Sequence, residues 1–135
     1  MFHITDDVGL FARAAVGLAE LPAVFPAKRV EGMVLAGCAR WLEFRIVETE
    51  LRGERLQLTA EVVHEERLRD MSGFNRAQHA VLEAAILATR LHILQRDEVL
   101  REVARMAVVV DKTAGEAERE AWGFIAGYIA ERLGL

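Results

Sequence analysis

An arginine stands at the start of one long apolar segment, SGFNRAQHAVLEAAILATRLHIL, which covers residues 72–94. Asn75 is suited to cap a helix at this point, with Gln78 as its capping-box partner. Arg76 then takes the first helical position, at the positive end of the helix dipole. A cation there is unfavourable by a few tenths of a kcal/mol unless an anion lies beside it.

A bound anion would resolve this conflict. The free backbone N–H groups of the helix, the close approach that Gly73 allows and the charge of Arg76 together indicate a phosphate or carboxylate site. An ion pair of Arg76 with Asp70 or with Glu83 would explain the residue equally well, because such pairs are common on protein surfaces. The sequence leaves both interpretations open.

A second cation stands near a predicted helix start. In DKTAGEAE, Thr113 and Glu116 have the spacing of a capping box, which would put Lys112 just before a helix N-terminus. We therefore count Lys112 and Thr113 as candidate anion ligands. The plainer interpretation is a solvated lysine beside a well-made cap.

Other chemistry-bearing residues form no recognisable constellation. His79 and Glu83 are four residues apart, as metal ligands often are, but no further ligand set accompanies them. Cys38 has no basic partner nearby in the sequence, which argues against a thiolate nucleophile. No Ser/His/Asp order or pair of carboxylates stands out, so the sequence predicts no reaction.

Composition favours one compact soluble domain. The chain has 135 residues, of which 53% are hydrophobic, with two prolines and a net charge of −4. Acidic and basic residues are interspersed, so we expect no nucleic-acid partner. A single cysteine excludes an internal disulfide and fits the cytoplasm. No leader or membrane-spanning run is evident, so we expect neither secretion nor membrane insertion.

Hydrophobic periodicity predicts strands followed by helices, hence an α+β fold. MFHIT is expected as a short strand and residues 8–21 as a helix that Pro22 and Pro26 stop. Residues 41–65 alternate as an antiparallel hairpin with a turn at Arg52 and Gly53. Its apolar faces are Leu42, Phe44 and Ile46 on one strand and Leu56, Leu58, Ala60 and Val62 on the other. Helices are expected at Arg76–Leu94, Glu98–Val110 and Ala114–Leu133, the last ending near Gly134.

These strands are too few for a stable sheet. Two or three strands leave exposed edges that need a covering surface. Helices of the same chain, a second copy of the chain or further strands upstream could supply it. We expect a homodimer that buries the apolar faces of the hairpin.

Three stretches carry a resemblance to a known family. GFNRAQHAVLEAAILATRL, with ITDDVGLFARAAVG before it and DKTAGEAEREAWGFI after it, resembles an uncharacterised flavoprotein-like family. In that family an FMN-binding split barrel precedes a helical C-terminal region, and members occur beside genes of tetrahydromethanopterin-linked one-carbon metabolism. Family members usually carry several more strands upstream of the segment that matches FHITDD. The chain resembles the second half of the barrel plus the helices.

The resemblance implies a partial antiparallel split β-barrel with a C-terminal helical bundle, as one domain over residues 1–135. Half-barrel strands and one helix would occupy residues 1–70, and three helices residues 71–135. Phe74, Asn75 and Arg76 match the family signature, and Lys112 and Thr113 match its C-terminal loop. The resemblance does not identify the residues that touch the flavin. The argument from helix N-termini favours Asn75, Arg76, Lys112 and Thr113 for phosphate or substrate contact.

Two classes of function follow from this resemblance. The first is an FMN-binding protein, for which the resemblance implies an oxidoreductase role in tetrahydromethanopterin-linked one-carbon metabolism. The second is a non-catalytic dimerisation or assembly module that lacks the N-terminal half of the flavin site. The visible absorption of the purified protein would separate the two.

Overall fold

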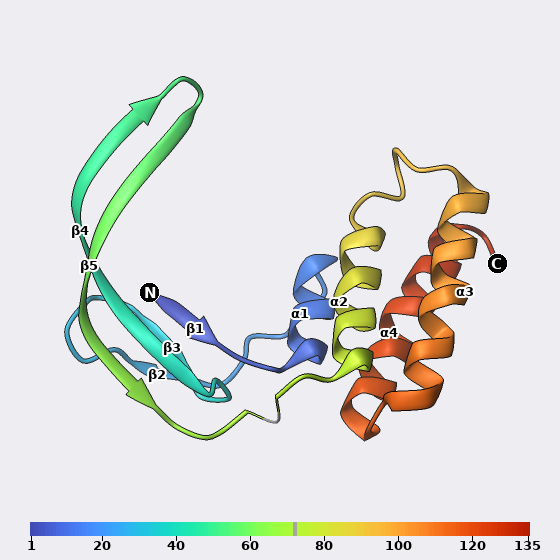
Figure 1. Ribbon diagram of the computed structural model, residues 1–135, viewed down its shortest axis with the longest axis horizontal. Coiled ribbons are helices and arrows are strands. Elements are labelled where there is room, and N and C mark those ends of the chain that lie inside the picture. The colour runs from blue at the N-terminus through green and yellow to red at the C-terminus, as the bar shows by residue number, and fades with distance from the viewer. Residues whose placement is uncertain (72) are drawn as a thin grey trace. The chain divides into compact units, whose positions relative to one another are not determined.

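The computed structural model describes residues 1–71 and 73–135, and Ser72, in the predicted anion-site segment, lies outside them. The chain divides into two compact units. The strand unit comprises Met1–Asp6 and Pro22–Met71, and the helical unit comprises Asp7–Leu21 and Ser72–Leu135. Mixed α+β structure is confirmed (Figure 1), and the elements are β1 Phe2–Ile4, α1 Val8–Ala15, β2 Val24–Pro26, β3 Met33–Leu35, β4 Arg40–Arg52, β5 Arg55–Arg67, α2 Arg76–Ala88, α3 Arg96–Thr113 and α4 Glu116–Arg132.

The described strands form two separate antiparallel sheets and do not close into a barrel. One sheet has the order β1-β4-β5, and the other pairs β2 with β3. The short strands β2 and β3 were not predicted, because three-residue strands carry too little alternation to be recognised. Val34, Cys38 and Trp41 form the small core of the strand unit, and the Phe25 ring meets the Trp41 ring edge-on at 5.5 Å.

The long β4–β5 hairpin has two distinct faces. Cross-strand pairing puts Phe44 beside Val62, Ile46 beside Ala60, Thr49 beside Leu58 and Leu51 beside Leu56, and partners in a pair share a face. We call this set the apolar hairpin face. The opposite face carries the pairs Arg45–Glu61, Glu48–Thr59 and Glu50–Gln57. The predicted hairpin, its turn at Gly53 (φ 62°) and its apolar alternation are therefore confirmed.

A bulge in β4 keeps the apolar hairpin face continuous. The register steps from Ile46↔Ala60 to Glu48↔Thr59, which leaves Val47 as the extra residue. Without it, strict alternation would turn Leu51 to the face opposite Ile46. Nearer the core the phase also differs from the prediction, because Trp41 and Glu43 are the fully buried residues of β4, while Leu42 and Phe44 are only half-buried.

The helical unit is built around α2. Its buried face consists of small residues, which allow neighbouring helices to approach closely, namely Ala77, Ala80, Val81, Ala84, Ala85 and Ala88. The α1 helix packs with α2 and α4. The expected division of the chain placed this helix with the strands, because it lies between them in the sequence. Its contacts assign it to the helical unit.

The predicted helix boundaries shift at several ends. The α1 helix ends at Ala15, well before Pro22, because Gly17 adopts a left-handed conformation (φ 74°) just after it. The α2 helix ends at Ala88 and not at Leu94. Gly134 has φ 69°, as expected of a glycine that follows a helix.

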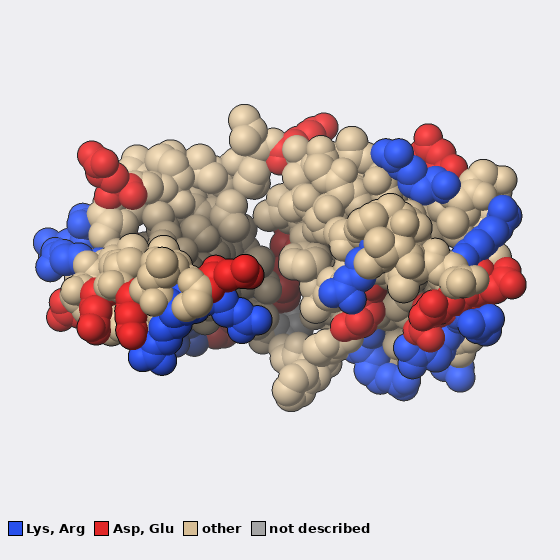
Figure 2. Space-filling model, turned by 90° about the horizontal axis from the view of Figure 1, so that it is seen from above, with Lys and Arg blue, Asp and Glu red and all other residues tan. Residues whose placement is uncertain are grey.

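Charge is spread over the visible surface. On the face shown in Figure 2, acidic and basic side chains alternate over both units without a large field of one sign. Within residues 1–71 and 73–135, no helix is long and apolar enough to cross a membrane.

Candidate functional site

The start of α2 has the capped geometry that the sequence predicts. Asn75 is in an extended conformation, and its Oδ1 accepts a hydrogen bond from the backbone N–H of Ala77 at 2.8 Å. This confirms Asn75 as the N-cap and Arg76 as the first helical residue. Gly73, two residues before the cap, has φ 78°, a conformation that favours glycine.

The prediction that Gln78 is the capping-box partner of Asn75 is wrong. Gln78 does not complete a box, because its side-chain amide donates to Glu118 Oε1 of α4 at 2.9 Å. Glu118 is buried, and its Oε2 accepts the backbone N–H of Gly115 at 2.9 Å. Glu118 therefore joins the first turn of α2 to the first turn of α4, a long-range contact that sequence spacing does not reveal.

Arg76 is exposed and has no ion pair or hydrogen bond within the described residues. Of the two acids considered as its partners, Asp70 pairs with Arg67 at 2.7 Å. Glu83 makes no ion pair or hydrogen bond with the described residues. The structure thus gives Arg76 no structural partner on its own helix, which leaves its guanidinium available to a ligand.

Phe74, two residues before Arg76 in the chain, presents an open aromatic surface. Its side chain is fully exposed, with a relative accessibility of 101%, and its ring stacks on that of His79 with centroids 6.5 Å apart and an angle of 28°. A fully exposed phenylalanine is unusual, since burial of such a side chain is worth roughly 1.5–3 kcal/mol. The ring is suited to stack on a planar ligand.

The capping role predicted for Thr113 is wrong, and Lys112 does not stand just before a helix N-terminus as predicted. α3 continues through Thr113, whose hydroxyl donates to the carbonyl of Val109 at 2.7 Å, and the N-cap of α4 is Gly115. Lys112 consequently lies in the last turn of α3, where its charge is favourable for the dipole of that helix. The helical pattern continues without a break into Lys112 and Thr113, so no local signal marks the end of this helix.

The five candidate residues nevertheless lie at one end of the helical unit. α2 starts where α3 ends and α4 starts, because the three helices run up, down and up (Figure 1). The hydrogen bonds of Gln78 and Gly115 with Glu118 tie two of these ends together. This end carries the side chains of Phe74, Asn75, Arg76, Lys112 and Thr113.

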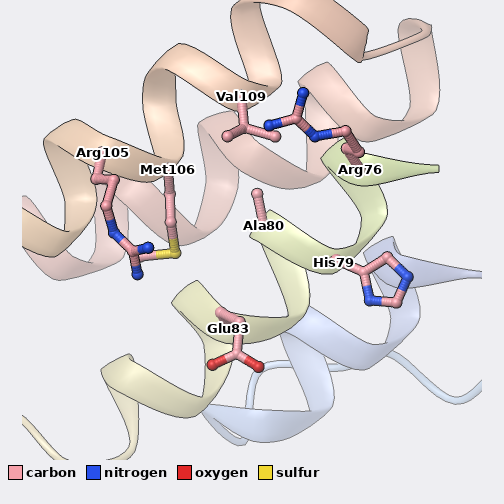
Figure 3. Close-up of a pocket in the computed structure, with 7 residues that line it drawn as sticks. All are labelled: Arg76, His79, Ala80, Glu83, Arg105, Met106 and Val109. Carbon is pink, nitrogen blue, oxygen red and sulfur yellow. The ribbon is translucent and has the colours of Figure 1, made fainter.

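A groove of about 300 Å³ extends from Arg76 along the helices. Its lining comes from one face of α2 and one face of α3, and consists of Arg76, His79, Ala80, Glu83, Arg105, Met106 and Val109. In Figure 3 the Arg76 side chain extends toward Val109, and the His79 ring points away from α3. The groove thus includes three polar residues of α2 at helical spacing, Arg76, His79 and Glu83.

The strand unit contains a buried carboxylate that the sequence analysis missed. Glu43 is fully buried and accepts hydrogen bonds from the backbone N–H groups of Lys28 (2.9 Å), Arg29 (2.6 Å) and Val30 (3.2 Å), and from Trp41 Nε1 (3.0 Å). Burial alone raises the pKa of Glu43, but these four donors outweigh it and lower the pKa to about 2. The carboxylate is fully used in holding the segment after β2.

Cys38 and His3 are also structural residues. Burial raises the pKa of the Cys38 thiol, although Arg69 is close enough to oppose that shift, contrary to the expectation of no basic partner. His3 Nε2 accepts the backbone N–H of Leu35 at 3.3 Å, and burial lowers the pKa of its ring. Within the described part of the chain, no three or more His, Cys, Asp or Glu side chains gather as a metal site would require.

Comparison with known proteins connects this fold to a flavin-containing structure. Residues 75–127, which include four of the five candidate residues, match DUF447_C, a family described as protein of unknown function (DUF447). The chain also resembles the crystal structure of the FMN-bound protein MM1853 from Methanosarcina mazei, which carries the same DUF447 designation. The TM-score is 0.71 at 20% identity, over 93% of this chain and 69% of that chain. No curated protein matches the chain. At this identity the likeness is one of fold, and this chain shares the fold of an FMN-bound DUF447 protein.

Proposed function

We propose that this chain binds FMN at the end of the helical unit where α2 begins. The observation that carries the proposal is the fold shared with FMN-bound MM1853, at a TM-score of 0.71 over 93% of this chain. The residues at this end fit the two parts of the cofactor. A guanidinium at a helix N-terminus with no partner among the described residues suits a phosphate, and an exposed aromatic ring suits a flavin ring.

The proposed contacts differ in what each residue has left to offer. Arg76 supplies charge and hydrogen-bond donors to the phosphate. Asn75 already uses its Oδ1 on Ala77, so it fixes the helix start and can donate only from its amide nitrogen. Lys112 adds a second cation at the same end. The Thr113 hydroxyl already donates its hydrogen bond to the carbonyl of Val109, so its oxygen can only accept from a ligand.

Phe74 would pack against the flavin ring. A flavin ring is flat and largely apolar, and the exposed Phe74 side chain already stacks on His79. Insertion of a second ring on its free side would bury apolar surface that now faces water. Bound FMN would supply hydride and single-electron transfer, and the residues named here would bind and orient it.

Flavin titration tests the proposal. FMN added to the purified chain should lose fluorescence with saturation near one equivalent, and riboflavin, which lacks the phosphate, should bind at least about tenfold more weakly. Arg76→Gln should remove most of that preference for FMN, whereas Arg101→Gln, an exposed arginine elsewhere on α3, should not. Absence of saturable FMN binding by the wild-type chain would overturn the proposal.

The reaction and its setting form a further part of the proposal. The resemblance described from the sequence suggests an oxidoreductase of tetrahydromethanopterin-linked one-carbon metabolism, and the single buried cysteine is compatible with a reducing cytoplasm. Anaerobic mixing of the FMN-loaded chain with reduced tetrahydromethanopterin derivatives should bleach the visible flavin band. A flavin that stays oxidised with every such derivative would contradict this role while leaving flavin binding intact.

A second candidate function is an assembly module, favoured by the apolar hairpin face. Ile46, Leu51, Leu56, Leu58 and Val62 are between 46% and 72% exposed within the described residues. A continuous apolar strip of this kind indicates a protein–protein contact. A homodimer would cover it with an identical strip, as two-fold symmetric interfaces do.

A further inference from the structure

The groove between α2 and α3 carries two unpaired charges of opposite sign. Arg76 and Glu83 both line it, and neither makes an ion pair or hydrogen bond within the described residues. They are seven positions apart on α2, which separates their backbones by roughly 10 Å along the helix axis. Pairs on one helix form at three or four positions, so Arg76 and Glu83 are too far apart to neutralise each other.

The other charged residue of the groove is already engaged. Arg105 Nη2 lies 2.6 Å from Glu102 Oε2, one turn away on α3. His79 stacks on Phe74 and turns its ring away from α3 (Figure 3). The charges free to meet a ligand are thus a cation at one end of the groove and an anion near the other.

Between these charges the floor of the groove is apolar. Ala80 and Met106 are each only 6% exposed, and Val109 is half-buried beside them. The hollow exists because Ala80 has a single methyl group where a larger side chain would fill the space between the helices. Met106 offers a flexible, polarisable surface that adapts to flat apolar groups.

We propose that this groove binds a small organic anion whose flat apolar body carries an N–H donor at the end opposite the anionic group. The anionic group, a phosphate or carboxylate, meets Arg76, the body covers Met106 and Val109, and the donor reaches Glu83. Drug-sized pockets span about 300–1,000 Å³. At about 300 Å³ the groove suits a ligand smaller than a flavin nucleotide. This ligand is therefore distinct from FMN, and its binding does not depend on the proposed function.

4-Aminophenyl phosphate is a suitable probe, since it joins a phosphate to an amine through an aromatic ring. Phenyl phosphate lacks the donor, and inorganic phosphate lacks both donor and body. The readout is the NMR signal of the Met106 ε-methyl group. The chain has four methionines, and Met1, Met33 and Met71 belong to the strand unit, so their signals serve as internal controls.

The expected result is a saturable shift of the Met106 signal alone, with an affinity order of 4-aminophenyl phosphate, then phenyl phosphate, then inorganic phosphate. Arg76→Met should weaken the probe by about tenfold or more, the loss expected for a charge-assisted hydrogen bond. Glu83→Gln should weaken 4-aminophenyl phosphate by about threefold or more while leaving phenyl phosphate unchanged. The exposed residues Arg101 and Glu131 provide matched controls as Arg101→Met and Glu131→Gln.

Three outcomes would overturn the proposal. The first is the absence of a Met106 shift up to about 10 mM probe, a concentration at which even a millimolar site would be mostly filled. The second is an equal shift of all four methionine signals. The third is an equal loss of affinity for both aryl phosphates in Glu83→Gln. Glu83→Gln also separates this proposal from flavin binding, because it should leave FMN affinity unchanged. If the wild-type chain binds the probe but does not bind FMN, only the proposed function is contradicted.

Discussion

The Gln78 side-chain amide lies 2.9 Å from Glu118 Oε1 and thereby fixes the first turn of α2 against the first turn of α4. The same carboxylate accepts the N–H of Gly115, so one buried acid satisfies donors from two segments that are distant in sequence. A buried carboxylate with both oxygens occupied holds a helix end in one position. The candidate flavin site begins at this helix end.

Glu118→Ala should destabilise the helical unit. The substitution leaves the Gly115 N–H and the Gln78 amide without their acceptor, at a loss of about 1–3 kcal/mol in the free energy of unfolding. Chemical denaturation followed by circular dichroism measures the difference. Glu116→Ala, which changes an exposed acid two residues earlier in α4, is the control. Equal stability of the two variants would show that the Glu118 contacts contribute nothing.

Arg76→Ala should weaken FMN or phosphate binding by about 1.5–3 kcal/mol, the range of a charge-assisted hydrogen bond. The unfolding free energy of the ligand-free protein should stay constant or rise by a few tenths of a kcal/mol, because a cation at the positive helix end is removed. Thermal melts with and without FMN separate the two effects. A variant that melts lower without ligand and keeps the full ligand-induced rise would refute the anion-site interpretation.

Acid should weaken the strand unit through Glu43. The pKa of this carboxyl falls from its ordinary 4.5 to about 2 in the folded chain. A lowered carboxyl pKa adds stability that is complete above pH 4.5 and is lost as the pH falls toward 2. Melting temperatures of wild type and Glu43→Gln over this window test the assignment. The wild type should lose its advantage with falling pH, and a constant difference would argue against Glu43 as the titrating group.

Self-association should depend on the apolar hairpin face. We expect the wild-type chain to sediment as a dimer at micromolar concentration and Leu58→Lys, which places a charge on that face, to sediment as a monomer. Gln57→Lys adds the same charge to the opposite face and should leave the dimer intact. A soluble wild-type monomer under these conditions would exclude the homodimer.

Local signals in the sequence were sufficient where the structure is local. The Asn75 cap, the hairpin turn at Gly53 and the glycine end at Gly134 depend on neighbouring residues, and all three were predicted. Contacts between residues that are distant in the sequence could not be predicted from such local signals. Gln78 has the spacing of a capping-box partner, but the acceptor offered by Glu118, 40 residues away, takes its amide.

Burial likewise could not be inferred for charged residues. Glu43 lies in an alternating strand between two apolar residues, and its pattern is that of a solvent-facing position. The backbone donors of Lys28, Arg29 and Val30 make its burial favourable, and the sequence does not show that these residues lie beside it. For Lys112 the difficulty was different. The α3 helix extends three residues beyond its predicted end at Val110, so Lys112 lies in the last turn of α3 and not just before α4.

The extra residue Val47 sets the shape of the β4–β5 hairpin. A bulge increases the local twist of a strand and bends it, and the hairpin in Figure 1 is visibly curved along its length. Deletion of Val47 would restore strict alternation with every cross-strand pair facing as it does now, so the apolar hairpin face would survive. Deletion of Thr49 would also remove the one-residue excess, but strict alternation would then turn Glu48 onto the apolar hairpin face. The hairpin should therefore tolerate a one-residue shortening at position 47 and at few other positions, and the shortened hairpin should be straighter.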